Sequence, residues 1–189
     1  MQNNITIPDD VLEAMLQHRV LMMCGISGSG KTTVARLLQA HGYSLLSTDH
    51  IVWERYGRDY DDFDAARRAE IFMQSNVELR QRLADMLEQG GRVVIDAPLC
   101  KCAGRDALRA LCGRYGASCL IVYLPADYDT LARRLARRSG NGPDDRIVPT
   151  DDLRRFTLNF EPPTADEPTL TLLPADIGSA DCSDNFRSM

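Results

Sequence analysis

The eight residues from Gly25 to Thr32 constrain the fold of this chain more than any other stretch. They read G-I-S-G-S-G-K-T and match the phosphate-binding pattern G-x-x-x-x-G-K-[ST] at every specified position. An apolar run at 20–24 precedes the match and a helical pattern follows it, which is the strand–loop–helix context that the pattern needs. The alternative is a glycine-rich turn that binds nothing. The agreement of the flanking elements instead favours a chain that binds a nucleoside triphosphate.

The chemistry of such a loop assigns roles to its residues. Backbone N–H groups and the positive end of the following helix form an anion site, while a lysine adds a mobile positive charge. We expect Lys31 to reach the β- and γ-phosphates of ATP and the Thr32 hydroxyl to bind Mg²⁺. The expected nucleotide-binding residues are Gly25, Ser27, Gly28, Ser29, Gly30, Lys31, Thr32 and Thr33.

Composition bounds the class of protein. A chain of 189 residues with 44% hydrophobic and 26% charged residues is typical of one globular domain with a sizeable core. The net charge of −5 argues against broad binding to nucleic acid. No apolar run reaches the length of a membrane span, and the N-terminus does not resemble a signal peptide. We therefore expect a cytoplasmic protein with no membrane partner.

The six cysteines give no clear metal or disulfide pattern. Cys24 and Cys119 lie in apolar runs and are expected to be small buried residues. Metal binding and disulfides are both less favoured than reduced thiols in a chain of this kind. The spacing assigns no role to Cys100, Cys102 and Cys112.

Strand-like and helix-like segments alternate along the chain, which predicts an α/β fold with a parallel sheet covered on both faces. The expected domain covers residues 1–173, with residues 1–18 as a helical extension and 174–189 as a disordered tail. The expected strands are 19–24, 44–48, 92–95, 118–124 and 170–173, and the main helices are 31–41, 64–89, 104–115 and 127–138.

Two aspartates follow expected strands, at the sheet edge where ligands of parallel sheets collect. An alcohol that attacks a phosphoryl group must lose its proton, and a carboxylate can accept it. We expect Asp49 to be this base and Asp96 to lie on the metal side. The alternatives are a helix cap for Asp49 and a turn residue for Asp96.

The helix at 127–138 carries four arginines. Arg134 and Arg138 flank its apolar stripe on one side, so they are the better candidates to clamp the transferring phosphoryl group. A solvated basic face is the alternative reading. The loop at 140–143 is rich in glycine and would let the segment close as a small lid that excludes water.

An aromatic and basic stretch follows Asp49, at the place where an acceptor would approach the base. Surface or core packing explains each of its residues equally well. The candidate acceptor-binding residues are Trp53, Arg55 and Arg58 from this stretch, and Arg105 after the third strand.

Together these segments resemble the small ATP-binding "predicted kinase" group of P-loop proteins, which is similar to chloramphenicol phosphotransferase, zeta toxin and the 5′-kinase domain of polynucleotide kinase. The resemblance implies the P-loop NTPase fold with strand order 2-3-1-4-5, a base at the S-T-D aspartate and lid arginines at R-L-x-x-R. One departure is visible, since relatives in this group have an arginine soon after the base, where this chain has Val52-Trp53. The residues that carry the resemblance are 25–33, 47–49, 93–96, Arg105, 134–138 and 160–167.

These observations favour an ATP-dependent kinase that phosphorylates a hydroxyl of a small-molecule acceptor. One alternative is an ATPase or nucleotide-dependent switch without such an acceptor. The chain lacks an N-K-x-D motif, an Asp-Glu pair after the third strand and an L-S-G-G-Q signature, which counts against that alternative. A polynucleotide 5′-hydroxyl kinase is the other alternative, but the acidic net charge makes nucleic acid the weaker partner. The sequence does not identify the acceptor or the oligomeric state.

Overall fold

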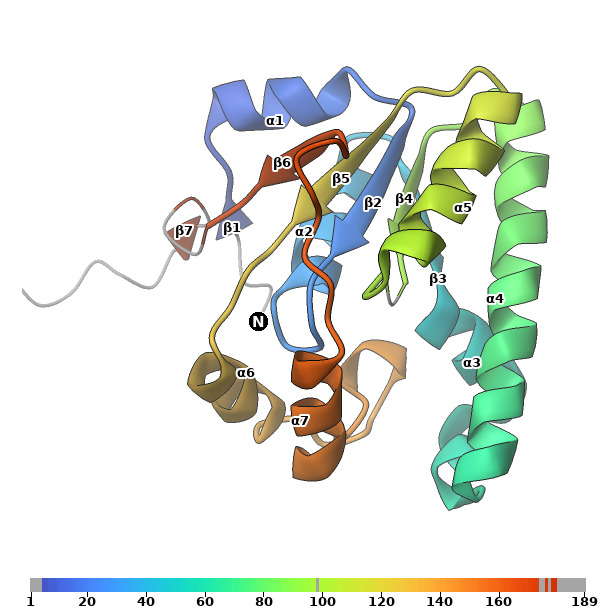
Figure 1. The fold of residues 1–189 in the computed structure, drawn as a ribbon, viewed down its shortest axis with the longest axis vertical. Helices are drawn as coiled ribbons and strands as arrows, with labels where there is room; N and C mark the ends of the chain where they lie inside the picture. The colour runs from blue at the N-terminus through green and yellow to red at the C-terminus, as the bar shows by residue number, and fades with distance from the viewer. Residues whose placement is uncertain (1–4, 98, 174–175, 177, 180–189) are drawn as a thin grey trace, which may run out of the picture.

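The computed structural model describes residues 5–97, 99–173, 176 and 178–179. At its centre lies a five-stranded parallel sheet (Figure 1). The strand order is β3-β4-β2-β5-β6, which is 2-3-1-4-5 when the five strands are counted along the chain, so the expected fold class is confirmed. The strands are β2 (Val20–Cys24), β3 (Ser44–Ser47), β4 (Val93–Asp96), β5 (Cys119–Tyr123) and β6 (Thr169–Thr171).

The helices lie close to their expected positions. One helix, α7, was not expected, although Thr150 and two aspartates in its first turn are helix-start signals. The elements are α1 (Asp9–Leu16), α2 (Lys31–Ala40), α3 (Thr48–Tyr56), the 3₁₀ turn η1 (Gly57–Asp62), α4 (Ala65–Glu88), α5 (Cys102–Arg114), α6 (Tyr128–Leu135), the 3₁₀ turn η2 (Pro143–Asp145) and α7 (Thr150–Leu158).

Both faces of the sheet are covered, as the apolar strands require. Successive side chains of a strand point to opposite faces. Met22 packs on one face with Leu83 of α4 and Leu108 of α5, whereas Met23 packs on the other face with Leu38 of α2. All five residues of β2 are buried, which explains why its sequence is continuously apolar instead of alternating.

The N-terminal helix α1 packs on the same face of the sheet as Met23 and α2, since Met15 is fully buried among those residues. Next to it, Ile5–Thr6 (β1) pairs antiparallel with Gly178–Ser179 (β7). The rest of the expected disordered tail falls almost entirely outside the described residues. The expected domain limits stay a prediction. Among the helices of the described residues, none combines the length and the apolar character that a membrane crossing needs.

Removing the Tyr43 hydroxyl should weaken the attachment of α1. This buried hydroxyl donates to the carbonyl oxygen of His18 at 2.6 Å and accepts from Arg92 Nη2 at 2.7 Å. Because Tyr43→Phe would leave both groups without this partner, we expect a loss of about 1–2 kcal/mol in the free energy of unfolding. Urea denaturation measures it. Tyr115→Phe is the control, because Tyr115 is 37% exposed and should lose little. Equal losses in the two variants would contradict this account.

Candidate functional site

The loop from Gly25 to Thr32 has the conformation that its glycines permit. Gly28 and Gly30 adopt φ angles of 89° and 108°, which residues with a Cβ atom rarely adopt. At Gly25 a Cβ atom would lie 2.6 Å from Ser29 Oγ and 2.7 Å from the carbonyl oxygen of Leu124. Helix α2 begins at Lys31, within this stretch, so its first N–H groups have no acceptor within the helix. The loop therefore presents an anion-binding helix end.

Two side chains of the loop fit a phosphate ligand. Ser29 is 5% exposed, and its buried hydroxyl has no hydrogen-bond partner among the described residues. Since an unsatisfied buried hydroxyl is costly, a bound oxyanion would relieve this cost. Lys31 folds back over the loop, where Nζ donates to the carbonyl oxygen of Ile26 at 3.3 Å. The residues present thus suit the phosphates of a nucleotide.

Thr32 and Asp96 meet at the carboxyl ends of the central strands. The Thr32 hydroxyl donates to Asp96 Oδ2 at 2.6 Å, across 64 residues of sequence. Asp96 closes β4 and stands in register with Met23 of β2 and Ser47 of β3. The two expected metal-side residues are therefore in direct contact. A hydroxyl and a carboxylate are oxygen ligands of the kind that Mg²⁺ prefers.

Asp49 lies in the first turn of α3 but does not cap it. The cap is Ser47, whose side chain accepts from the N–H of His50 at 3.4 Å. The Asp49 carboxylate is instead 45% exposed and accepts from Arg146 Nη1 at 3.1 Å. The protein packed around this partly exposed carboxylate removes water from it and so raises the pKa of Asp49. The positive charge of Arg146 lowers the pKa, the negative charge of Asp96 raises it, and the positive charge of Lys31 lowers it. The two aspartates and the lysine therefore share one electrostatic environment.

Arg146 belongs to the lid segment, which we define as residues 136–149. Its guanidinium lies 4.2 Å from the centre of the Tyr60 ring and 3.6 Å from Asp61, in addition to its contact with Asp49. The sequence analysis missed Arg146, because it assigned the positive charges of the lid to Arg134 and Arg138 and considered only residues 140–143 of the loop. An arginine placed just after a glycine-rich loop was the available signal.

A second contact holds the lid segment against α3. His50 Nε2 lies 2.8 Å from Asp144 Oδ1, and Arg36 of α2 also pairs with Asp144. The hydrogen bond to Asp144 raises the pKa of His50. The segment thus lies closed over α2 and α3, as expected of a lid.

The two clamp candidates have separate contacts, and only Arg134 lies on α6, because the helix expected at 127–138 ends at Leu135. Arg134 Nη1 donates to the carbonyl oxygens of Gly28 and Ser29 at 3.1 and 3.2 Å, so it lies against the phosphate loop. Arg138 Nη1 donates to the carbonyl oxygen of Arg146 at 3.2 Å and supports the lid segment. Both residues therefore adjoin the candidate site from the lid side.

The candidate acceptor residues on α3 and η1 are less closely gathered. Arg58 donates to Asn141 of the lid segment at 2.7 Å. Arg55 pairs with Glu78 of α4, so its charge is already compensated at the contact between the two helices. Trp53 is half-buried on α3. Their roles in acceptor binding stay predictions.

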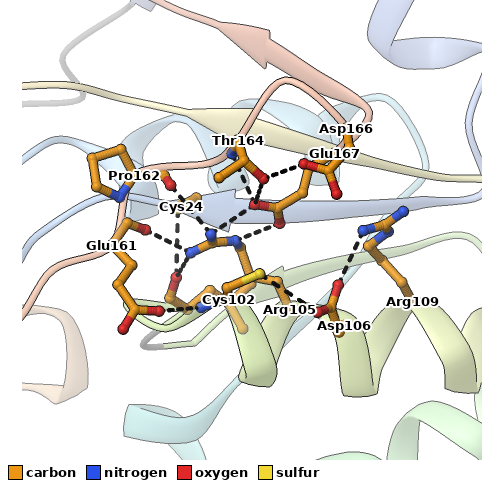
Figure 2. A network of polar contacts seen from close by, with 11 residues as sticks. Cys24, Cys102, Arg105, Asp106, Arg109, Glu161, Pro162, Thr164, Asp166 and Glu167 are labelled. Carbon is orange, nitrogen blue, oxygen red and sulfur yellow. Dashed lines mark hydrogen bonds and ion pairs between the residues drawn. The ribbon is translucent and has the colours of Figure 1, made fainter.

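The expectation for Arg105 is corrected by the structure. Arg105 is fully buried, and all five of its N–H donors are used within the protein, as Figure 2 shows. Two go to the Glu167 carboxylate at 2.7 and 2.8 Å, and three go to carbonyl oxygens. Its partner lies 62 residues away in sequence, so no local pattern indicated the pairing. Arg105 therefore ties residues 161–167 to α5 and has no donor left for an acceptor.

Comparisons with known proteins agree with this geometry. A family model described as an AAA domain matches residues 20–163. A shikimate kinase from Symbiobacterium thermophilum is 32% identical over 136 residues, which cover 66% of this chain and 71% of that protein. A probable gluconokinase from Mus musculus is 29% identical over 170 residues, with 78% and 85% covered. Chaetomium thermophilum Kti12 in complex with ADP-AlF3 has a similar fold, with a TM-score of 0.64, 19% identity, and 83% of this chain and 92% of that chain covered.

Loss of the Arg105 guanidinium should destabilise the protein strongly. In Arg105→Gln the fully buried Glu167 carboxylate would lose its charge partner, and removing one member of a buried pair costs about 3–5 kcal/mol. Arg109→Gln is the matched control on the same helix, because its pair with Asp106 is exposed and should contribute less than about 1 kcal/mol. Urea denaturation measures both variants. Comparable stabilities would show that the buried pair does not hold residues 161–167.

Proposed function

Since the chain belongs to the AAA-domain family whose model it matches, we propose that it is a kinase that transfers the γ-phosphoryl group of Mg²⁺·ATP to a hydroxyl of a small-molecule acceptor. One observation carries the proposal. A half-exposed carboxylate, Asp49, lies in the first turn of α3 at the sheet edge where Thr32 meets Asp96, beside a loop shaped for phosphates. The names of the shikimate kinase and gluconokinase relatives support a small-molecule acceptor.

The phosphate loop would bind the nucleotide. The N–H groups at the start of α2 would donate to phosphate oxygens, with Lys31 adding its charge beside them. Thr32 and Asp96 would hold the metal ion, since their oxygens already lie 2.6 Å apart. Bound Mg²⁺ would supply positive charge that offsets the charge developing on the transferring group. The protein's part is thus to position the phosphates and to stabilise charge.

Asp49 would act on the acceptor. The surrounding protein raises the pKa of Asp49, a direction that favours uptake of a proton by its carboxylate. Arg146 now occupies one of its oxygens, so the acceptor hydroxyl would have to share or replace that contact. The guanidinium would then stay within reach of the reacting groups.

The lid segment would exclude water from the reaction. Arg134 of α6 lies against the phosphate loop, and within the lid segment Arg138 holds the backbone of Arg146. Positive charges that converge on a transferring phosphoryl group stabilise its transition state. A closed lid also limits hydrolysis of ATP, which a kinase must avoid.

Replacing the proposed base should abolish most phosphoryl transfer. Asp49→Asn keeps the size of the side chain but removes the proton acceptor, so we expect kcat to fall by about 10²- to 10⁴-fold. Transfer is measured with γ-labelled ATP across sugars, hydroxy acids, nucleosides, antibiotics and oligonucleotides. Asp61→Asn is the matched control, since Asp61 also contacts Arg146 but has no proposed part in the chemistry.

The same assay separates the kinase from an acceptor-independent ATPase. A kinase should show little hydrolysis without acceptor and a strong dependence on Asp49. Substantial hydrolysis that no acceptor increases, and that Asp49→Asn leaves intact, would refute the proposed function.

Removing the lysine of the loop provides an independent test. Lys31→Ala should lower kcat by about a hundredfold or more while leaving the unfolding midpoint near that of the wild type, because the amine serves charge stabilisation more than packing. The control is Lys101→Ala, where the lost pair with Glu161 is on the surface. Wild-type turnover in Lys31→Ala would remove the proposed role of this residue.

A further inference from the structure

Two hollows lined mainly by residues of α4 and α5 adjoin one another, and together we call them the groove between α4 and α5. It consists of a hollow of about 400 Å³ near the start of α5 and a second of about 580 Å³ near the end of that helix. Val77 and Arg80 of α4 line both hollows, so the two adjoin. None of the candidate site residues discussed above lines either one.

The near end of this groove adjoins the candidate site. Ala97 lines the smaller hollow and directly follows Asp96. Asn76 lines it as well and accepts a hydrogen bond from the Thr48 hydroxyl at 3.3 Å. Thr48 directly precedes Asp49. A molecule in the smaller hollow would therefore lie next to the elements that carry both acids.

The wall of the smaller hollow is mainly apolar. Leu79, Leu99 and Leu108 are each no more than 4% exposed and form its inner side. Met73 and Val77 are 64% and 53% exposed at its rim. Large apolar side chains that face solvent around a hollow are typical of a binding site. A polyhydroxylated molecule would leave this surface poorly matched, whereas an apolar body would fill it.

Uncompensated positive charge lies along the same groove. Neither Arg80 nor Arg114 has a carboxylate partner within the described part of the chain. Arg82, two residues from Arg80, is by contrast paired with both Glu54 and Glu78. Because the protein has a net charge of −5, a pair of unpaired arginines in one groove favours an anionic ligand there.

We infer that the acceptor is an alcohol with an apolar body and an anionic group, and that this body lies in the groove between α4 and α5. Its hydroxyl end would point toward Asp49, and its anionic group would bind Arg80 or Arg114. The inference rests on the proposed function for the place of the hydroxyl. The apolar wall of the groove and its two arginines support the apolar body and the anionic group of this acceptor. The contact of Asn76 with Thr48 supports the place of the groove beside the site.

Two glycines of α5 provide a matched pair of variants for testing the groove. Gly104 lines the smaller hollow, whereas Gly113 lines neither, and a Cβ added at either position meets no atom within 4 Å. Gly104→Phe should therefore fill the groove without disturbing the helix, and Gly113→Phe should leave it open. Arg133→Gln is the control for a double variant, Arg80→Gln with Arg114→Gln, because Arg133 is exposed on α6 and lines neither hollow.

The probe is 1-anilinonaphthalene-8-sulfonate, which joins apolar rings to a sulfonate and becomes fluorescent when bound. Magnesium and a non-hydrolysable ATP analogue are present throughout, so that the nucleotide site is filled. We expect saturable binding that weakens about tenfold or more in Gly104→Phe and in the double arginine variant. The two controls should match the wild type. Equal binding in Gly104→Phe and Gly113→Phe would overturn the inference.

Kinetics then separates the inference from the proposed function. For an acceptor found in the labelled-ATP screen, the double arginine variant should raise KM about tenfold with little change in kcat. Acceptor-dependent transfer with a KM unchanged in Gly104→Phe would leave the kinase in place but refute the groove as its acceptor site. Hydrolysis that no acceptor stimulates would refute the kinase itself, and with it this acceptor.

Discussion

The contact between Thr32 and Asp96 is the one on which the rest of the site depends. It joins the first turn of α2 to the end of β4, because parallel strands deliver their carboxyl ends to one edge of the sheet. The same register places Ser47 opposite Asp96 and so brings α3, with Asp49, to that edge. A change in strand order would separate these residues even if each local element formed correctly.

Residues whose role is set by local geometry could be predicted from the sequence. The glycines of the phosphate loop indicate positive φ angles and positions with no room for a side chain. Gly25 and Gly28 both have positive φ angles, and a Cβ atom at either position would lie close to neighbouring atoms. Asp96 could be placed because it ends an apolar run, and a buried parallel strand is the element such a run forms. The strand order itself came from the family resemblance, since no local pattern specifies which strands are neighbours.

The errors and omissions concern pairings across long stretches of sequence. Arg105 looked like a binding residue because it follows a strand, but its partner Glu167 comes 62 residues later. That carboxylate makes burial of the guanidinium possible, since an unpaired buried charge is very costly. Arg146 was missed for the related reason that its contacts with Asp49 and Tyr60 arise only once the lid segment folds back. Local sequence patterns do not indicate which distant residues will pair in the folded protein.

The two sides of the candidate site are therefore held by interactions of different strength. On one side, the ion pair of Arg105 and Glu167 is inaccessible to water, and the pKa of Glu167 is lowered to about 2 by the hydrogen bonds from Arg105. On the other side, the lid segment is held by contacts such as Arg146 with Asp49, which keep substantial exposure and contribute little each. Breaking the lid contacts thus costs far less than disturbing the buried pair. The lid segment can therefore open while the strand ends that carry Asp96 stay fixed.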